Sequence, residues 1–256
     1  MLQAERLNSI RKYVDTVGYA ELNNLVKEFG ISKATARRDL QRLMSENVIE
    51  LTRGGAVSVQ KKGSLYEDAY SIKSEHNKEE KQRIAKAACE MLKERHSVFL
   101  DSSTTVREMV PEIKKIDFEI VIATNDIMIA SDLIEAENIT VNVVGGTLRK
   151  GYYTLTGVFA ETILRELSLD VAFMSCDSAN LTNGFSLTNV EEVQLKRMIV
   201  DAADNAVMLC DSSKFEKSSF MQMFDISAPS KIITGKELHD DIYNMYLERG
   251  VDIIRA

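Results

Sequence analysis

The sequence is poor in residues that build metal centres or disulfide frameworks, and it lacks a long apolar run. Its 256 residues include three cysteines and three histidines, and no His/Cys cluster has metal-ligand spacing. The cysteines lie far apart in apolar runs and form no CxxC pair, which is typical of buried thiols in a reducing compartment. No stretch approaches 18 apolar residues, so we expect no membrane span.

Internal repeats and low-complexity segments are also missing from the sequence. The N-terminus carries charges where a signal peptide needs its apolar region, so we expect a cytoplasmic protein. Hydrophobic residues make up 45% of the chain, enough for a core. The length suits a small domain followed by a medium one.

The net charge of −7 is unevenly distributed along the chain. Residues 1–62 hold eleven Lys or Arg and seven Asp or Glu, a net of +4, so the remainder carries −11. Whole-chain charge is a poor guide when one small domain makes the phosphate contacts of a DNA-binding protein. An acidic remainder would reduce non-specific DNA binding.

Residues 1–60 are predicted to form a winged helix-turn-helix domain. Apolar residues at helical spacing predict helices over about Ala4–Val17, Glu21–Phe29 and Ser32–Asn47. Two short β runs, Val48–Leu51 and Val57–Val59, are joined through a pair of glycines and predict a hairpin. Three helices followed by a hairpin are typical of this domain.

The third predicted helix carries the most specific signal in the sequence. Its buried stripe is Ala36, Leu40 and Leu43, while Arg37 and Arg38 lie on the opposite face. Such a helix enters the major groove, where arginine reaches a guanine edge or a phosphate. A solvated helix with two arginines is the alternative, which the preceding helix and turn disfavour. The residues expected to contact double-stranded operator DNA are Ser32, Lys33, Thr35, Arg37, Arg38 and, at the wing tip, Arg53.

Residues 61–76 are predicted to be a linker, and residues 77–256 to be an α/β domain in which apolar strands alternate with helices. The predicted strands are Ser97–Leu100, Glu119–Ala123, Ile139–Val144, Val171–Cys176, Ala206–Cys210, Lys231–Thr234 and Val251–Ile254. The predicted helices are Lys78–Lys93, Val106–Ile113, Ile127–Ala136, Val158–Leu167, Glu191–Ala203 and Leu238–Arg249. This alternation predicts a Rossmann-like parallel sheet covered on both faces, with ligands at the C-terminal strand ends.

Polar clusters follow four of the predicted strands. Asp101–Thr105 forms a hydroxyl-rich turn that opens a helix, an arrangement that can bind an anion. Thr124-Asn125, Gly145-Gly146 and Asp211–Lys214 follow the other three strands. A lysine near a phosphate and an aspartate accepting from sugar hydroxyls would suit a phosphorylated polyol. The alternatives are ordinary helix caps and, for Asp211 with Lys214, a local ion pair.

Residues about 3–59 resemble the DNA-binding domain of the DeoR family of bacterial repressors. The residues that carry the resemblance are Glu21-Leu22, Phe29, Ser32, Thr35, Arg37 through Leu40, Leu43 and Gly54-Gly55-Ala56. The chain departs from the family pattern at Asn47, Leu51 and Arg53, where the family usually has Gly, Arg and His.

Residues about 77–255 resemble the sensor domain of the same family, whose fold is akin to ribose-phosphate isomerases and coenzyme A transferases. The resemblance implies a sugar-phosphate effector, a phosphate turn at Ser102–Thr105, and an effector response through Lys81, Asp211 and Lys214. The full set of expected effector-binding residues is Lys81, Asp101, Ser102, Ser103, Thr104, Thr105, Thr124, Asn125, Gly145, Gly146, Asp211 and Lys214.

The sensor part departs from the family pattern at four positions. Ser103, Ser175 and Ser178 stand where the family often has glycine, and Gly235 stands where it usually has aspartate. A glycine at Ser103 would allow a positive φ beside the ligand. We therefore expect either a pocket shaped for an unusual effector, with the loop Asp177–Thr188 contributing, or a partly degenerate pocket.

We interpret the chain as an effector-controlled repressor of a carbohydrate-metabolism operon, acting without a metal or cofactor. A single winged helix-turn-helix offers few base contacts, so we expect paired half-sites and a homodimer or homotetramer. One alternative is a sugar-phosphate isomerase or transferase-like enzyme with an accessory DNA-binding domain, although no nucleophile motif stands out. Another is a DNA-binding protein whose α/β domain only oligomerises.

Overall fold

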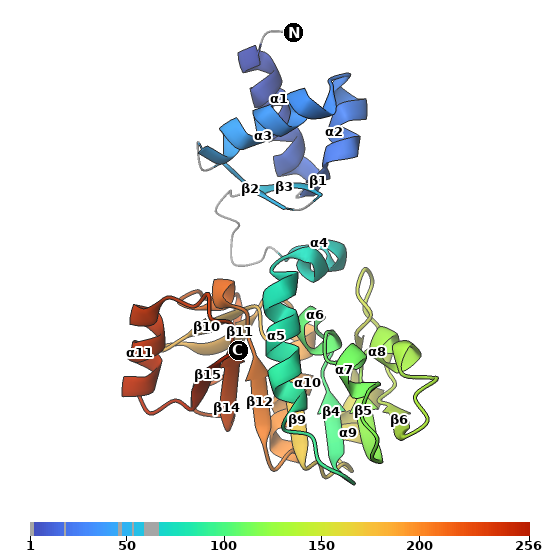
Figure 1. The fold of residues 1–256 in the computed structure, drawn as a ribbon. Helices are drawn as coiled ribbons and strands as arrows, with labels where there is room; N and C mark the ends of the chain where they lie inside the picture. The colour runs from blue at the N-terminus through green and yellow to red at the C-terminus, as the bar shows by residue number, and fades with distance from the viewer. Residues whose placement is uncertain (1–2, 18, 46–47, 53, 59–66) are drawn as a thin grey trace. The chain divides into compact units, whose positions relative to one another are not determined.

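A computed structural model describes residues 3–17, 19–45, 48–52, 54–58 and 67–256 of the chain. They belong to two compact units, Met1–Asp68 and Ala69–Ala256, hereafter the N-terminal and C-terminal units (Figure 1). Of the predicted linker 61–76, residues 61–66 lie outside the described residues, and the part from Ala69 onward belongs to the C-terminal unit. None of the described helices is both long and apolar enough to cross a membrane.

The N-terminal unit has three helices and a small antiparallel sheet. The helices are α1 (Gln3–Val17), α2 (Leu22–Phe29) and α3 (Lys33–Ser45). The strands are β1 (Tyr19–Glu21), β2 (Ile49–Leu51) and β3 (Gly55–Ser58), in the order β1-β3-β2. The helices and the β2–β3 hairpin confirm the predicted winged helix-turn-helix. Strand β1 was not predicted, because three residues are too few to show strand periodicity.

One apolar core holds the N-terminal unit together. Ile10 of α1, Leu25 of α2, Leu43 of α3 and Ile49 of β2 are fully buried in it. Gly30 ends α2 with a φ of 60° and donates its N–H to the carbonyl of Val26. Glycine adopts this left-handed conformation without steric cost. The turn that directs the chain from α2 into α3 therefore depends on a glycine.

The C-terminal unit is built on a seven-stranded parallel sheet in the order β15-β14-β12-β9-β4-β5-β6 (Figure 1). Its strands are β4 (Ser97–Leu100), β5 (Ile120–Thr124), β6 (Ile139–Val143), β9 (Val171–Met174), β12 (Ala206–Leu209), β14 (Lys231–Thr234) and β15 (Ile253–Arg255). Every pairing between these strands is parallel. The predicted Rossmann-like α/β class is confirmed, and all seven strands overlap the predicted ones.

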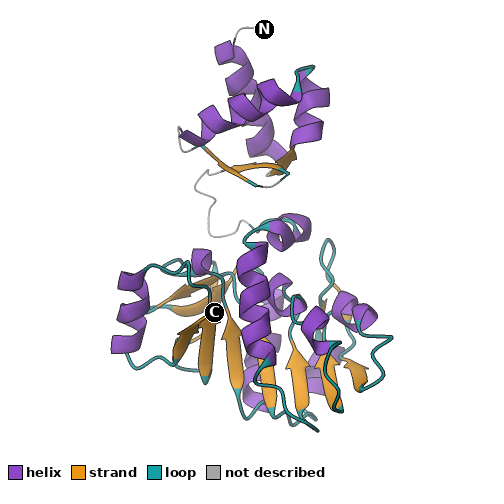
Figure 2. Ribbon diagram, viewed as in Figure 1, coloured by secondary structure: helices purple, strands orange, loops and turns teal. Residues whose placement is uncertain are grey.

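Helices lie on both faces of this sheet (Figure 2). The helices are α4 (Tyr70–Glu75), α5 (Lys78–Cys89), α6 (Thr104–Arg107), α7 (Val110–Ile113), α8 (Ile127–Asp132), α9 (Val158–Leu164), α10 (Val190–Ala202) and α11 (Asp240–Glu248). Buried residues of α5 through α8 share one core cluster with the sheet. Buried residues of α9, α10 and α11 share a second cluster on the opposite face.

The predicted helix Val106–Ile113 is wrong, because two short helices, α6 and α7, occupy this segment. Pro111 lies in the first turn of α7. Its ring would clash with the carbonyl four residues earlier, and it has no N–H to donate, so a continuous helix cannot pass through it. The break leaves α6 as a separate short helix directly after the hydroxyl-rich turn.

Two further sheets in the C-terminal unit were not predicted. One is antiparallel and contains β10 (Ser178–Asn180), β11 (Gly184–Leu187) and β13 (Met221–Phe224). The other pairs β7 (Thr147–Leu148) with β8 (Leu155–Thr156). The predicted loop Asp177–Thr188 therefore contains two strands. These strands are too short for a period-two pattern to be recognised in the sequence.

Candidate functional site

The start of α3 is fixed by a side-chain cap. The Oγ of Ser32 accepts the backbone N–H of Thr35 at 3.1 Å and lies 2.9 Å from the Thr35 hydroxyl. This is the N-cap that the sequence predicts. Ser32 and Lys33 are exposed, and Thr35 is half-buried. The first turn of α3 therefore carries the hydroxyl groups of Ser32 and Thr35 at the helix N-terminus.

The two faces of α3 are arranged as predicted. Ala36, Leu40 and Leu43 are buried in the core of the N-terminal unit. Arg37 and Arg38 are exposed on the other side. The remaining predicted DNA contact, Arg53, lies outside the described residues. The exposed side of α3 therefore combines two guanidinium groups with the hydroxyls of its first turn.

Asp39 has a structural role that the sequence analysis did not assign. It is buried, and it accepts from the Arg6 guanidinium at 2.6 Å and 3.2 Å. Side-chain hydrogen bonding to Asp39 raises the pKa of Arg6. The pair joins α1 to α3. Asp39 therefore fixes the position of the helix that carries Arg37 and Arg38, and it does not face solvent with them.

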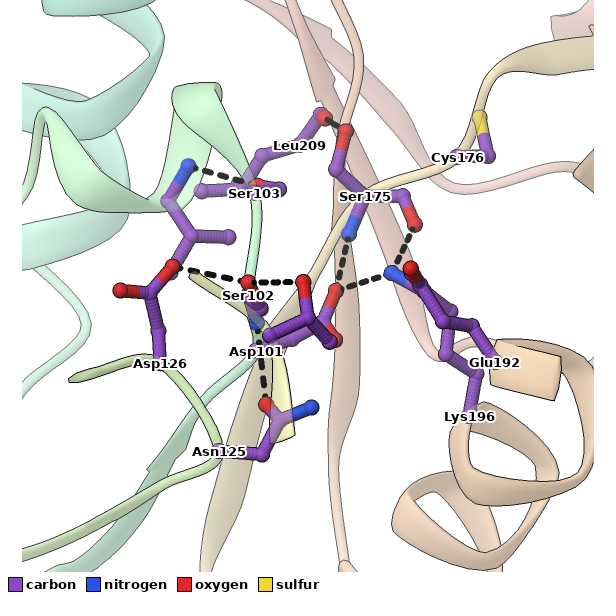
Figure 3. Close-up of polar contacts among 12 residues, drawn as sticks. Asp101, Ser102, Ser103, Asn125, Asp126, Ser175, Cys176, Glu192, Lys196 and Leu209 are labelled. Carbon is purple, nitrogen blue, oxygen red and sulfur yellow. Dashed lines mark hydrogen bonds and ion pairs between the residues drawn. The ribbon is translucent and has the colours of Figure 1, made fainter. Parts of the chain in front are cut away.

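In the C-terminal unit, most of the predicted effector residues lie at the C-terminal ends of the sheet strands. Asp101 follows β4 and is buried under two donors, the Lys196 ammonium and the backbone N–H of Ser175 (Figure 3). Lys196 also donates to the Ser175 carbonyl at 3.0 Å. Burial by itself lowers the pKa of Lys196, but the Asp101 and Glu192 carboxylates outweigh it and raise the value.

Ser102 is held by three neighbours, two that follow β5 and one that precedes β8. Its N–H donates to Asn125 at 3.0 Å, and its hydroxyl donates to Asp126 at 2.8 Å (Figure 3). The Thr154 hydroxyl lies 2.7 Å from the same oxygen. Because Ser102 is buried and its hydroxyl is bonded within the protein, its side chain holds the turn in place.

Ser103 caps α6 by accepting the N–H of Val106 at 3.0 Å. Its φ is −158°, an extended conformation that any residue adopts. The departure from the family glycine therefore imposes no backbone strain here. Thr105, the second residue of α6, is fully buried, and its Oγ has no hydrogen-bond partner among the described residues. The same holds for Oδ1 of Asp101.

Lys81, near the start of α5, contacts the hydroxyl-rich turn at Thr104. Its buried ammonium donates to the Thr104 hydroxyl at 3.1 Å and to the backbone carbonyl of Lys73 in α4. Burial lowers its pKa to about 8, and the Asp211 carboxylate opposes that shift. Lys81 is therefore a lysine of lowered pKa on the hydroxyl-rich turn, and it joins that turn to α4.

Asp211 and Lys214 follow β12. Asp211 is buried and accepts from the Asn77 amide at 2.9 Å and the Ser213 N–H at 3.2 Å. Burial raises its pKa, but Lys214 and Lys81 outweigh burial and lower it to about 2. The Lys214 ammonium lies 3.9 Å from Asp211 and donates to the Ser175 hydroxyl at 2.8 Å. This ionised carboxylate and its two lysines form a charged cluster beside the turn.

The remaining predicted positions support the strand ends. Thr124 donates its hydroxyl to the Leu100 carbonyl at 2.6 Å, and Asn125 donates its amide to the Leu155 carbonyl at 3.3 Å. A Cβ on Gly146 would lie 2.4 Å from the Thr156 carbonyl oxygen. Gly145 is half-buried and has open space at its Cβ position. Thr124 thus ties β5 to β4, whereas Asn125 and Gly146 lie against β8 of the β7–β8 hairpin.

A cavity of about 520 Å³ opens beside the turn. It is lined by Tyr70, Ser74, Glu75, Lys78, Thr104, Arg107, Glu108, Val110, Pro111, Lys114 and Asp132. Thr104 is the predicted effector residue among them. Arg107 spans one wall, donating to Asp132 at 2.8 Å and to the Tyr70 hydroxyl at 3.2 Å. A ligand that starts at Thr104 and fills this cavity would contact α4.

Several residues of this region were missed by the sequence analysis. Lys73 pairs with Asp177 at 2.7 Å, and Glu80 accepts the N–H of Ser212 at 2.6 Å. Lys196 lies far along the chain from its partner Asp101. Charged residues on amphipathic helices ordinarily face solvent, so nothing local marks these as buried. A glutamate or lysine at a core-facing helical position is the signal that could have found them.

Comparison with known proteins gives matches over almost the whole chain. Residues 6–62 match the DeoR-like helix-turn-helix domain, and residues 76–236 match the DeoR C terminal sensor domain. The HTH-type transcriptional regulator GlpR of Haloferax volcanii is 33% identical over 99% of this chain and 98% of its own length. A putative aga operon transcriptional repressor of Escherichia coli O157:H7 is 30% identical over 98% of this chain and 93% of its own length.

Solved structures with a similar fold cover part of the chain. A probable sor operon regulator from Shigella flexneri matches 63% of this chain and 86% of its own, with a TM-score of 0.43 and 9% identity. The ribose 5-phosphate isomerase of Methanocaldococcus jannaschii matches 54% of this chain and 55% of its own, with a TM-score of 0.41 and 17% identity.

Proposed function

Because this chain belongs to the DeoR family of transcriptional regulators, we propose that it represses a carbohydrate-metabolism operon in the cytoplasm and that a phosphorylated sugar releases it. The chain is a regulator and not an enzyme. The observation that carries the effector proposal is the charged cluster of Lys81, Asp211 and Lys214 beside the hydroxyl-rich turn at Thr104.

The proposed DNA contacts lie on α3. The exposed Arg37 and Arg38 read base edges or bind phosphates in the major groove. The capped first turn, with Ser32, Lys33 and Thr35, binds a backbone phosphate. Arg53 remains a contact proposed from the sequence. Operator DNA is thus bound by the unit whose sequence carries the net positive charge.

The proposed effector contacts are of two kinds, donors for the phosphate group and carboxylates for the sugar hydroxyls. Lys81 and Lys214 supply cations, and Thr104 supplies a hydroxyl donor, for the phosphate group. The ionised Asp211 accepts from sugar hydroxyls, as does Oδ1 of Asp101, which has no hydrogen-bond partner among the described residues. Removing that buried oxygen from water without a partner costs free energy, which a ligand hydroxyl would recover.

The first test of the effector proposal replaces Lys214 by alanine. We expect affinity for a sugar phosphate to fall about tenfold to a hundredfold, because one charge-assisted hydrogen bond is lost. The ligand is chosen by thermal-shift screening of pentose and hexose phosphates beside their unphosphorylated parents, and affinity is measured by calorimetry. The matched control is Lys217→Ala, an exposed lysine three residues away. Equal affinity in the Lys214→Ala variant and the wild-type chain would place the phosphate elsewhere.

We propose that helix α4 transmits the effector signal along the chain. It is the first helix of the C-terminal unit, and three contacts tie it to the proposed pocket. Lys81 donates to the carbonyl of Lys73, Lys73 pairs with Asp177, and Arg107 donates to the Tyr70 hydroxyl. An effector that takes over Lys81 and Thr104 weakens the first contact. We propose that α4 then shifts and changes operator affinity.

The second test severs α4 from Asp177 with a Lys73→Met variant. We expect this variant to bind effector within about threefold of wild type, whereas the effector-induced loss of operator affinity, typically about 5- to 150-fold for allosteric coupling, shrinks to under about threefold. Lys231→Met is the control, since it removes the same charge from a partly exposed pair with Asp252, away from α4 and from the cavity lining. Fluorescence anisotropy with operator DNA, with and without effector, measures both responses. A full response in the Lys73→Met variant would contradict the proposed role of α4.

A further inference from the structure

One side of the parallel sheet is incompletely covered at β5 and β6. Parallel sheets are ordinarily covered on both faces. Ala123 and Val144 point to the same side as α9 and are buried in one cluster with Ala160 and Leu164. Nearer the starts of the two strands on that side, Val121 is 43% exposed and Thr140 is also exposed. Helix α9 therefore covers the C-terminal ends of β5 and β6 and leaves their N-terminal parts exposed.

The outer face of α9 is apolar as well. Val158 is 66% exposed, Phe159 71% and Ile163 39%. Isolated exposed apolar residues are normal on protein surfaces, but a contiguous group of them indicates an interaction site. Positions 159 and 163 are one helical turn apart and lie together. The sequence VFAETIL thus makes a helix that is apolar on its buried face and largely apolar on its outer face.

The polar groups on this outer face are already satisfied within the chain. Thr162, in the middle of the face, donates its hydroxyl to the carbonyl of Val158 at 2.7 Å. Glu161 and Arg165 lie on the flank of the helix and pair with each other at 3.8 Å. Removing the face from water therefore leaves no hydroxyl unpaired and buries no isolated charge.

We propose that Val121, Val158, Phe159, Thr162 and Ile163, hereafter the α9 face, bind the same face of a second copy of this chain. The inference rests on the proposed function, because paired operator half-sites need two DNA-binding units and each chain carries one. Contact between identical faces about a two-fold axis closes the assembly at a dimer. Pairing of the two faces supplies the layer that is missing over β5 and β6.

The exposed apolar area of the α9 face is large enough to form the centre of a dimer interface. A fully exposed Phe offers about 200 Å² and an aliphatic side chain about 100 Å², so the exposed fractions correspond to roughly 300 Å² of apolar surface. A stable dimer buries about 800 Å² per subunit, of which the apolar centre is one part. The α9 face supplies that centre, and exposed polar residues around it, such as Asn142 of β6, supply the rim.

The test measures the mass of the full chain by sedimentation velocity without DNA, so its result does not depend on the proposed function. We expect wild type to be a dimer or larger. Phe159→Asp and Ile163→Lys should each weaken self-association about a hundredfold or more, at least halving the mass, because each places a charge in the apolar contact. Both side chains point outward, so unchanged circular dichroism shows that each variant is folded.

The matched control for these variants is Ile134→Asp. Ile134 is 81% exposed and follows α8, whose buried residues lie on the opposite face of the sheet. The Ile134→Asp variant therefore introduces the same charge as Phe159→Asp at an exposed apolar position on the other side of the sheet. This control should keep the wild-type mass. A monomeric wild-type chain, or an unchanged mass in either α9 variant, would overturn the proposal. A wild-type chain that is a dimer but binds no DNA would count against the proposed function alone.

Discussion

The Lys196→Met variant is expected to lose about 3–5 kcal/mol in the free energy of unfolding of the C-terminal unit. The side chains of Lys196 and Asp101 are 4% and 1% exposed, and the ammonium donates to the Asp101 carboxylate. Removing the lysine leaves a carboxylate in the core whose remaining donor is the Ser175 N–H at 3.2 Å, with its other oxygen unpartnered among the described residues. An uncompensated buried charge is among the most costly consequences of a point substitution.

Urea unfolding of the full chain, followed by circular dichroism, measures this loss. The control is Lys231→Met, which removes an ion pair with Asp252 that is 26% and 55% exposed, and it should cost about 1 kcal/mol or less. Adding Asp101→Asn to Lys196→Met removes the stranded charge and should restore part of the stability. A Lys196→Met loss as small as the control would mean that the pair does not act as a buried ion pair.

The lysine of this pair makes the stability of the chain depend on pH in the alkaline range. The pKa of Lys196 is raised in the folded chain above its ordinary value of 10.5. A group with a raised folded pKa contributes stability that is fully present below its unfolded pKa and is lost as pH rises through the folded value. Between pH 6 and 9 the contribution of Lys196 to the stability of the wild-type chain should therefore be constant. The Lys196→Met variant lacks the ammonium that opposes the burial-raised pKa of Asp101, so its loss in the free energy of unfolding should shrink as pH falls and this carboxyl is protonated.

The main sheet could be predicted from the sequence because buried parallel strands are continuous apolar runs. Strands β4 and β14 have the predicted bounds, Ser97–Leu100 and Lys231–Thr234. The antiparallel strands of the second sheet have three or four residues each and contain polar residues such as Ser186, so they lack a readable period. Pro111 lies at the break between α6 and α7, but the apolar spacing across it favours one continuous helix.

The positions of the candidate site residues could be predicted, but their contacts could not. The C-terminal ends of parallel strands meet at one edge of the sheet, so Asp101, Asn125 and Asp211 were assigned to a common region. The partners Lys196 and Asn77 come from helices, and their pairing depends on how these helices pack. Asp101 was predicted to face an effector, yet one of its oxygens is already bonded within the core.

The roles of the residues that depart from the family pattern could be assigned only from the structure. The Ser175 hydroxyl donates to the Leu209 carbonyl at 2.7 Å and accepts from Lys214. Ser178 bonds Ser219 at 2.8 Å. A Cβ on Gly235 would lie 2.3 Å from the Glu80 side chain. Each departure thus has a local structural role. The hydroxyl of Ser175, which holds Lys214, is the one that bears on the proposed pocket.

The double variant Arg37→Ala/Arg38→Ala is expected to lose about 30-fold or more of its operator affinity. Each base-reading arginine contributes about 1–3 kcal/mol, so loss of both corresponds to roughly 2–6 kcal/mol. Both side chains are exposed, whereas the neighbours Ala36 and Asp39 are buried. The substitutions should therefore leave the core of the N-terminal unit, and its unfolding temperature, unchanged.

The operator for this measurement is selected from a random DNA library by the wild-type chain. Fluorescence anisotropy over a range of salt concentrations then separates the two roles: loss of a phosphate contact flattens the salt dependence by about one unit of slope, whereas loss of a base contact relaxes sequence preference at one position. Arg11→Ala is the control, since Arg11 is a partly exposed arginine of α1 that pairs with Asp15. If the double variant binds the operator as tightly as the Arg11→Ala control, α3 does not read DNA through these two arginines.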